Sequence, residues 1–207
     1  MNDVSESRTS IKRQALDLLV THGYRGMSFA DLASSLGITR ANVHYHFGSK
    51  AKLIDEVLTD YVDATLRRLE QIWTSDDTPF RDKLSAMLEH SRARYRVFNR
   101  TGHTPRPWSL ISRLRQDEDM LTQSGRAQLR RFTAELHRLF DESAQHAHAS
   151  GEFRTETTPS AIAILLVAIV DNAASITMAD NSFGGLEAAY QALEVLAFPS
   201  RADLTSR

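Results

Sequence analysis

The sequence predicts an all-α protein. Apolar residues recur at i, i+3, i+4 and i+7 along most of the 207 residues, and neither sustained strand alternation nor an internal repeat interrupts them. Cap and stop residues divide the chain into about nine helical segments. A composition of 42% hydrophobic and 25% charged residues is ordinary for a globular chain long enough to bury a substantial core.

The first three expected helices are short and closely spaced. Residues 10–22 form one amphipathic helix, which Gly23 ends. The Ser28 hydroxyl is suited to capping a second helix, in which Phe29 and three following apolar residues share one face. Gly37 ends that helix, and Thr39 caps a third helix beginning at Arg40 after a turn of about three residues. This spacing predicts a helix-turn-helix.

Six further helices are expected after residue 48. Ser49 caps a fourth helix of about 24 residues, which extends roughly 36 Å at 1.5 Å per residue. Thr78-Pro79 and Thr158-Pro159 are typical helix starts, with the proline in the first turn. The segment 159–179 is apolar nearly all round, which predicts burial on more than one side. The other expected helices are 79–99, a short one carrying Trp108, Ile111 and Leu114, 126–149 and 186–197.

Charge is unevenly distributed over the chain. Residues 1–52 carry seven Lys+Arg against four Asp+Glu, and residues 53–207 carry eighteen against twenty-two. The absence of cysteine is consistent with a reducing compartment. The N-terminal residues are polar, unlike a signal peptide, and the apolar run 161–170 stops at Asp171, too short to span a bilayer. We therefore expect a soluble cytoplasmic protein without a membrane segment.

The third helix offers a polar face. Val43 and Phe47 lie one turn apart and are expected in the core, which turns the remaining side chains outward. Arg40 is suited to pairing with guanine and Asn42 with adenine, while histidines contact bases or phosphates. The alternative is a purely structural helical hairpin, but donor groups concentrate on the free face. The predicted DNA contacts are Ser28, Thr39, Arg40, Ala41, Asn42, His44, Tyr45, His46 and Lys50, with Ser28, Tyr45 and Lys50 as phosphate contacts.

The segment LGITRANVHYHFGSKAKLIDEVL resembles the helix-turn-helix signature of the TetR family of transcriptional regulators. The specific similarity runs from Ser10 to Leu58, and His44 departs from it where many relatives carry tyrosine. The resemblance implies a DNA-binding domain at 1–52 and an effector-binding and dimerisation domain at 53–207. It also implies a homodimer, through helices 126–149 and 159–179, that binds a near-palindromic DNA operator and releases it on binding a small-molecule effector.

The effector cavity implied by the resemblance would lie among the helices after Leu53. For most candidate lining residues, ordinary core packing is the simpler interpretation. Asp171 and Asn172 differ, because polar groups within an apolar helix need partners. The candidates are Met87, Tyr95, Phe98, His103, Trp108, Ile111 and Asn172.

The stretch from His90 to Gln116 contains seven arginines and no acidic residue. Arg92, Arg96 and Arg100 recur every fourth residue and share a face, which suits an anionic ligand such as a carboxylate or phosphate. A solvated face, or pairing with nearby acidic residues such as Glu89, is the alternative that we favour.

Other classes of function find little support. The imidazoles of His146 and His148 diverge by about 200° on a helix, so we expect no metal site, and no cofactor. Nucleophile-elbow, zinc-protease and nucleotide-binding motifs are absent, which argues against an enzyme. A helical protein-binding adaptor, a transcriptional activator and a regulator that requires its ligand remain alternatives to a repressor.

Overall fold

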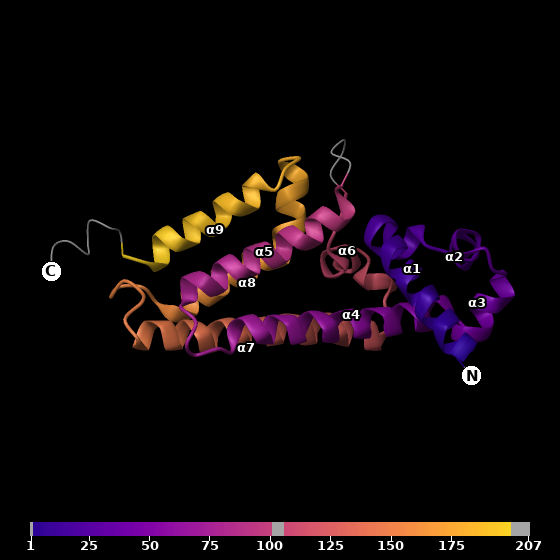
Figure 1. The fold of residues 1–207 in the computed structure, drawn as a ribbon, viewed down its shortest axis with the longest axis horizontal. Helices are drawn as coiled ribbons and strands as arrows, with labels where there is room; N and C mark the ends of the chain where they lie inside the picture. The colour runs from indigo at the N-terminus through magenta and orange to yellow at the C-terminus, as the bar shows by residue number, and fades with distance from the viewer. Residues whose placement is uncertain (1, 101–105, 200–207) are drawn as a thin grey trace. The chain divides into compact units, whose positions relative to one another are not determined.

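The computed structural model describes residues 2–100 and 106–199, and within these ranges it contains nine α-helices, one 3-10 helix and no strand. The predicted all-α class is therefore confirmed (Figure 1). The chain divides into two compact units. Unit 1 comprises Met1–Thr65 and Pro107–Arg131, and unit 2 comprises Leu66–Arg106 and Phe132–Arg207. The functional division expected at residue 52 stays a prediction.

Helix α1 (Asn2–Gly26) begins earlier than the predicted residue 10. The polar first turns are helical because Arg8 lies over the ring of Phe47 and bonds to groups outside its own helix. The expected stop at Gly23 appears as a kink, where φ is 72° and ψ is −173°. The helical turns after the kink bring Tyr24 and Arg25 beside the segment that follows α6.

The predicted helix-turn-helix is confirmed in α2 (Phe29–Leu36) and α3 (Arg40–Phe47). Ser28 and the N3 residue of α2 form a capping box, in which each side chain bonds to the other's backbone amide. Gly37 ends α2 in the left-handed conformation with φ 65°. The Thr39 hydroxyl then accepts a hydrogen bond of 3.1 Å from the amide of Asn42.

Helix α4 (Lys50–Trp73) has the predicted 24 residues. The Ser49 hydroxyl accepts a hydrogen bond from the amide of Lys52 at 3.2 Å, which confirms the expected cap. The apolar residues of α4 from Leu53 onward that face the core are buried. This helix contributes residues to both units, because the boundary between them falls after Thr65.

Helix α5 (Phe80–Phe98) shows that one predicted cap is wrong. Thr78 was expected to cap this helix, but the N-cap residue is Pro79, which makes no side-chain cap bond. The carboxylate of Glu152, far along the chain, accepts the hydrogen bond from the Phe80 amide at 2.7 Å. A long-range contact with Glu152 therefore supplies the hydrogen-bond acceptor that the local sequence led us to expect from the Thr78 hydroxyl.

Helix α6 (Leu110–Gln116) corresponds to the predicted short helix, and a 3-10 turn (Glu118–Met120) follows it. Helix α7 (Gln123–Ala149) begins three residues before the expected Arg126. The extra turn follows Thr122, whose hydroxyl accepts a hydrogen bond from a backbone amide in that turn at 3.0 Å.

Helices α8 (Pro159–Ala179) and α9 (Gly184–Ala197) pack against each other in unit 2 (Figure 1). The expectation that α8 is buried on more than one side is wrong within this chain, because Ile164 is 59% exposed and Leu165 and Met178 are 41% exposed. The apolar circumference of α8 therefore covers the core on one side and meets solvent on another.

By length and composition alone, α8 is sufficient to cross a membrane, its most apolar 18-residue window having a mean hydropathy of 2.0. This corrects the expectation drawn from the ten-residue run 161–170, which stopped at Asp171. Core helices of soluble proteins meet the same criteria, so the observation is weak support for a membrane segment.

Five aromatic rings form the centre of unit 2. Phe80 lies 5.4 Å from Trp73 and 5.0 Å from Phe153, measured between ring centroids. Phe140 packs on Trp73 at 4.7 Å, and Phe198 packs on Phe153 at 5.6 Å. The edge-to-face geometry of several pairs is the favourable one for aromatic quadrupoles. These rings tie the start of α5 to α4, α7 and the residue after α9.

Candidate nucleic-acid interface

Helix α3 buries one face and presents the other to solvent. Val43 and Phe47 are 0% and 1% exposed, whereas Tyr45 is 79% exposed. The remaining polar residues on the free face, among them Arg40 and Asn42, are exposed as well. Hydrogen-bond donors on the exposed face of a helix whose other face is held by two buried residues can reach the edges of base pairs. Contact with DNA by Arg40, Ala41, Asn42, His44 and Tyr45 stays a prediction.

The hydroxyls of Ser28 and Thr39 are engaged in capping. Ser28 Oγ donates to Asp31 Oδ2 at 2.6 Å and accepts from the Asp31 amide at 3.2 Å. The side-chain and backbone hydrogen bonds of Ser28 lower the pKa of the Asp31 carboxyl. Thr39 accepts from the amide of Asn42. Both residues therefore orient the two short helices, and phosphate contact by Ser28 or Thr39 would come in addition to this role.

The two histidines of α3 pack against neighbouring rings. The His44 ring lies 5.8 Å from Phe29 at an interplanar angle of 87°, which is edge-to-face. The His46 ring lies 5.4 Å from the ring of Tyr45. These contacts restrict the rotamers of both imidazoles and leave His44 exposed and His46 half-buried.

Lys50, at the start of α4, is half-buried. Its ammonium lies 4.6 Å from the centroid of the Tyr24 ring, which is a cation–π contact. Burial lowers the pKa of the Lys50 ammonium, and the carboxylates of Asp117 and Asp31 oppose this effect. Lys50 therefore belongs to the contact between α1, α2 and α4 as well as to the predicted phosphate-binding set.

Asp117, just after α6, holds the kink of α1 in place and was missed from the sequence. Its carboxylate accepts a hydrogen bond of 2.9 Å from the Tyr24 amide and lies 3.4 Å from Arg25 Nε. An alanine Cβ at Gly23 would lie 2.6 Å from Asp117 Oδ2, so the close approach depends on glycine. Arg113 adds a hydrogen bond of 3.1 Å to the carbonyl of His22. The sequence separation of more than ninety residues leaves no local signal for these contacts.

Arg8 is a second residue that sequence reasoning missed. Its guanidinium bonds to the carbonyl of His46 at 2.5 Å and to the carboxylate of Glu56, and lies 4.4 Å from the Phe47 ring centroid. Arg8 thereby joins α1 to the last turn of α3 and to α4 within unit 1.

The candidate effector residues in unit 2 differ in burial and in their contacts. Met87 is buried in α5, whereas Tyr95 and Phe98 are half-buried. The Tyr95 ring packs on Phe183 at 5.3 Å. Asn172 is exposed, and its side-chain amide donates to the carbonyl four residues earlier at 2.8 Å. These contacts match the core-packing alternative for Tyr95 and a local bond for Asn172.

Three candidates fall elsewhere. Trp108 and Ile111 are buried, at 5% and 4% exposure, in unit 1. His103 lies outside the described residues. Their assignment to an effector site stays a prediction.

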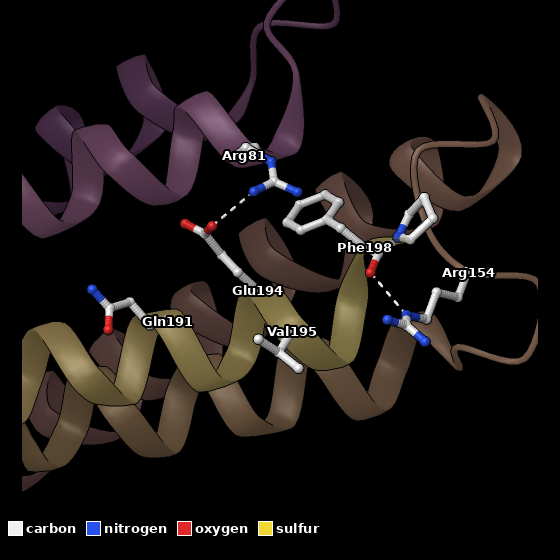
Figure 2. Close-up of a pocket in the computed structure, with 7 residues that line it drawn as sticks. Arg81, Arg154, Gln191, Glu194, Val195 and Phe198 are labelled. Atoms are coloured by element: carbon white, nitrogen blue, oxygen red, sulfur yellow. Dashed lines mark hydrogen bonds and ion pairs between the residues drawn. The ribbon is translucent and has the colours of Figure 1, made fainter. Parts of the chain in front are cut away.

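A hollow at the end of α9 was not foreseen. Its volume is about 370 Å³, and none of the predicted effector residues lines it. Figure 2 shows Arg81 directed toward Glu194 and Arg154 directed toward the Phe198 carbonyl. The ion pair measures 2.9 Å, and the hydrogen bond of Arg154 measures 2.8 Å. Both guanidiniums thus take part in bonds that fix the end of α9.

Arg92, in the arginine-rich stretch, pairs with two glutamates that lie outside the stretch. Its guanidinium lies 2.9 Å from Glu89 and 2.5 Å from Glu187, which agrees with the pairing alternative. His90 differs, because burial, followed by the charges of Arg94 and Arg68, lowers its pKa. Among the residues that the structure describes, no group of three or more His, Cys, Asp or Glu is placed to hold a metal ion.

Comparison with known proteins finds a family match for the helix-turn-helix segment. Residues 11–57 match the family model described as bacterial regulatory proteins, tetR family. The HTH-type transcriptional repressor KstR2 of Mycolicibacterium smegmatis is 26% identical over 98 residues, which are 44% of this chain and 47% of that protein. KstR2 of Rhodococcus jostii is 30% identical over 71 residues, 34% of this chain and 35% of that protein. The chain therefore matches about half or less of the length of these relatives.

Solved structures share the fold over nearly the whole chain. A TetR-family regulator from Agrobacterium tumefaciens superposes with a TM-score of 0.81 at 19% identity, covering 94% of this chain and 99% of that one. Reduced NemR of E. coli gives 0.78 at 17% identity over the same shares. A regulator from Saccharomonospora viridis in complex with choline gives 0.73 at 21% identity, covering 95% of this chain and 100% of that chain. At these identities the likeness concerns the fold.

Proposed function

We propose that this chain, which belongs to the TetR family of bacterial regulatory proteins, is a cytoplasmic repressor that binds a near-palindromic operator as a homodimer and is released by a small-molecule effector. The observation that carries the proposal is the exposed polar face of α3, fixed by Val43 and Phe47 beneath it. The repressor names of the KstR2 relatives favour repression over activation. No catalytic role is part of the proposal.

Exposed apolar side chains support a dimer through α8 and α9. Ile164, Leu165 and Met178 are exposed on α8, and Val195 and Leu196 are 69% and 57% exposed on α9. Such a patch favours burial against a second copy of the chain, because a two-fold axis makes one patch complementary to itself. The sequence prediction used α7 and α8, but the described part of α7 carries no large exposed hydrophobic side chain. The proposed interface is therefore α8 with α9.

In such a dimer each subunit places its α3 in the major groove. Two half-sites would be read about 34–36 Å apart, one helical turn of DNA. An effector that binds better to a dimer with another spacing would weaken operator binding by its differential affinity for the two states. Helices α4 and α7 are the elements suited to carrying that change, because each has residues in both units.

The test is selection of duplexes from a random-sequence DNA library by the purified protein, followed by titration of the selected duplex over a salt series. We expect a near-palindromic sequence whose binding weakens steeply with salt, because phosphate contacts release counterions. Tyr45→Ala should abolish selectivity with the fold intact, since Tyr45 is exposed. Val97→Ala, a truncation at a residue 56% exposed on α5, should leave selection unchanged.

Failure of a folded dimer to select any sequence would contradict the simple repressor. Repeating the selection with candidate metabolites would then separate a ligand-requiring regulator from a protein without a DNA role. Equal selection by the Tyr45→Ala and wild-type proteins would contradict the assignment of α3 as the reading helix.

A further inference from the structure

Arg8 makes three contacts on the side of α3 opposite to the proposed DNA face. Guanidinium Nη1 donates to the His46 carbonyl, Nη2 pairs with Glu56, and the group lies over the ring of Phe47. A helix leaves its last four carbonyls without an intrahelical donor, and His46 supplies one of these carbonyls at the end of α3. Arg8 therefore provides both the missing donor and a positive charge at the negative end of the α3 dipole.

The three contacts need the shape of arginine. A planar guanidinium can donate in two directions while its face lies on a ring, whereas an ammonium is a single point of charge. Glu56 is held from the other side by Lys12, whose ammonium lies 3.7 Å from the same carboxylate oxygen and 2.5 Å from Asp60. Arg8 and Lys12 thus link α1 to successive turns of α4. Of these two residues, Arg8 also contacts α3.

Arg8 also precedes the part of the chain that the family model matches, residues 11–57. The helical turns that carry it were not expected from the sequence. Its partners Phe47 and Glu56 lie inside the matched residues.

We propose that Arg8 is a positioning residue for operator recognition, holding the C-terminal turn of α3 against α4 without touching DNA itself. The inference rests on the proposed DNA-binding function. Loss of the anchor leaves α3 folded on Val43 and Phe47 but lets its last turn move, so contacts from the exposed face to base edges lose their register. Contacts to phosphates depend less on register, and non-specific binding is preserved.

The substitution Glu56→Gln separates this proposal from a purely electrostatic explanation by the direction of the change in DNA affinity. Removing a negative charge from a DNA-binding unit strengthens binding when only long-range electrostatics matters. If Glu56 acts by orienting Arg8, the same substitution weakens specific binding. The two explanations therefore predict opposite changes in affinity for one variant.

The experiment compares Arg8→Lys, Arg8→Gln, Glu56→Gln and Arg13→Lys. Arg13 is an exposed arginine on the same helix, so Arg13→Lys is the matched control for a swap that keeps charge. Fluorescence anisotropy with the duplex selected by the wild-type protein and with a scrambled duplex, over a salt series, gives both affinities and the salt slope. Circular dichroism melts show which variants are folded.

We expect Arg8→Lys and Glu56→Gln to weaken binding to the selected duplex about tenfold, equivalent to about 1.4 kcal/mol, with scrambled-duplex affinity and salt slope unchanged. Arg13→Lys should match the wild type. The proposal would be overturned by an affinity of Arg8→Lys for the selected duplex equal to that of the control, or by tighter binding of Glu56→Gln. It would also be overturned if the salt slope of Arg8→Gln fell by about one, because such a fall marks a direct phosphate contact. Absence of any selected duplex for the wild type would instead refute the proposed function itself.

Discussion

The kink of α1 gives a quantitative prediction for Gly23→Ala. At φ 72° and ψ −173° Gly23 occupies a region essentially restricted to glycine, where another residue costs of order 1–3 kcal/mol. The new Cβ would lie 2.6 Å from Asp117 Oδ2 and 2.8 Å from Arg113 Nε, so both side chains must move. Displacing Asp117 removes the acceptor of the Tyr24 amide, a hydrogen bond to a charged group worth about 1.5–3 kcal/mol. The expected loss in unfolding free energy is therefore about 2.5–6 kcal/mol.

Gly37→Ala is the matched control. Gly37 also has a positive φ, 65°, but its added Cβ would meet nothing within 4 Å. Only the backbone cost applies, about 1–2 kcal/mol. Urea unfolding at one fixed protein concentration measures both variants, since the proposed dimerisation would make stability concentration-dependent. Equal losses for Gly23→Ala and Gly37→Ala would refute the reasoning, because Asp117 would then contribute nothing through the kink.

Three further predictions concern titratable groups. Burial and neighbouring arginines lower the pKa of His90 below the ordinary 6.5, so the unfolded chain binds a proton at His90 more readily than the folded chain. The unfolding free energy should therefore fall as pH drops below about 6.5, and His90→Gln should remove this dependence in urea titrations. Lys83, 3% exposed, donates to a hydroxyl and a carbonyl; in thermal melts Lys83→Ala should cost about 2–4 kcal/mol, whereas the volume-conserving Lys83→Met should cost less. Hydrogen bonds from Ser28 lower the pKa of the Asp31 carboxyl, so the stability that Asp31 contributes is present above its ordinary pKa and is lost as pH falls through the lowered pKa. The Tm difference between wild type and Asp31→Asn should therefore vanish in acid, and a difference that persists there would contradict stabilisation by the ionised carboxylate.

Features that depend on neighbouring residues were accessible from the sequence. The caps at Ser28, Thr39 and Ser49 and the stop at Gly37 follow from the chemistry of a few adjacent groups, and all four are confirmed. The start of α1 was not accessible, because its polar first turns are held by Arg8 through groups of α3 and α4.

Thr78 illustrates the same limit from the opposite direction. A threonine before a proline is a good local cap, yet a carboxylate seventy-two positions away supplies the acceptor for α5. In the candidate interface, periodicity identified the buried pair Val43 and Phe47 and therefore the free face of α3. Periodicity does not distinguish an aromatic residue that lines a cavity from one that packs on another ring, as Tyr95 does on Phe183.

Side-chain hydrogen bonds within unit 1 connect α4 and α7, and the segment after α6, to helices α1 and α3. The Thr122 hydroxyl donates to the carboxylate of Asp55 on α4 and lies 2.8 Å from each of its two oxygens, so the start of α7 is fixed to α4. Asp117 fixes the segment after α6 to α1, and Arg8 fixes α1 to α3. These separate bonds are joined by residues 117–122 and by helix α1, so a displacement of α4 or α7 acts on contacts that lead to the last turn of α3. In the proposed dimer we expect such a displacement to change the orientation of α3, on which the spacing between two half-sites depends, because these bonds are directional.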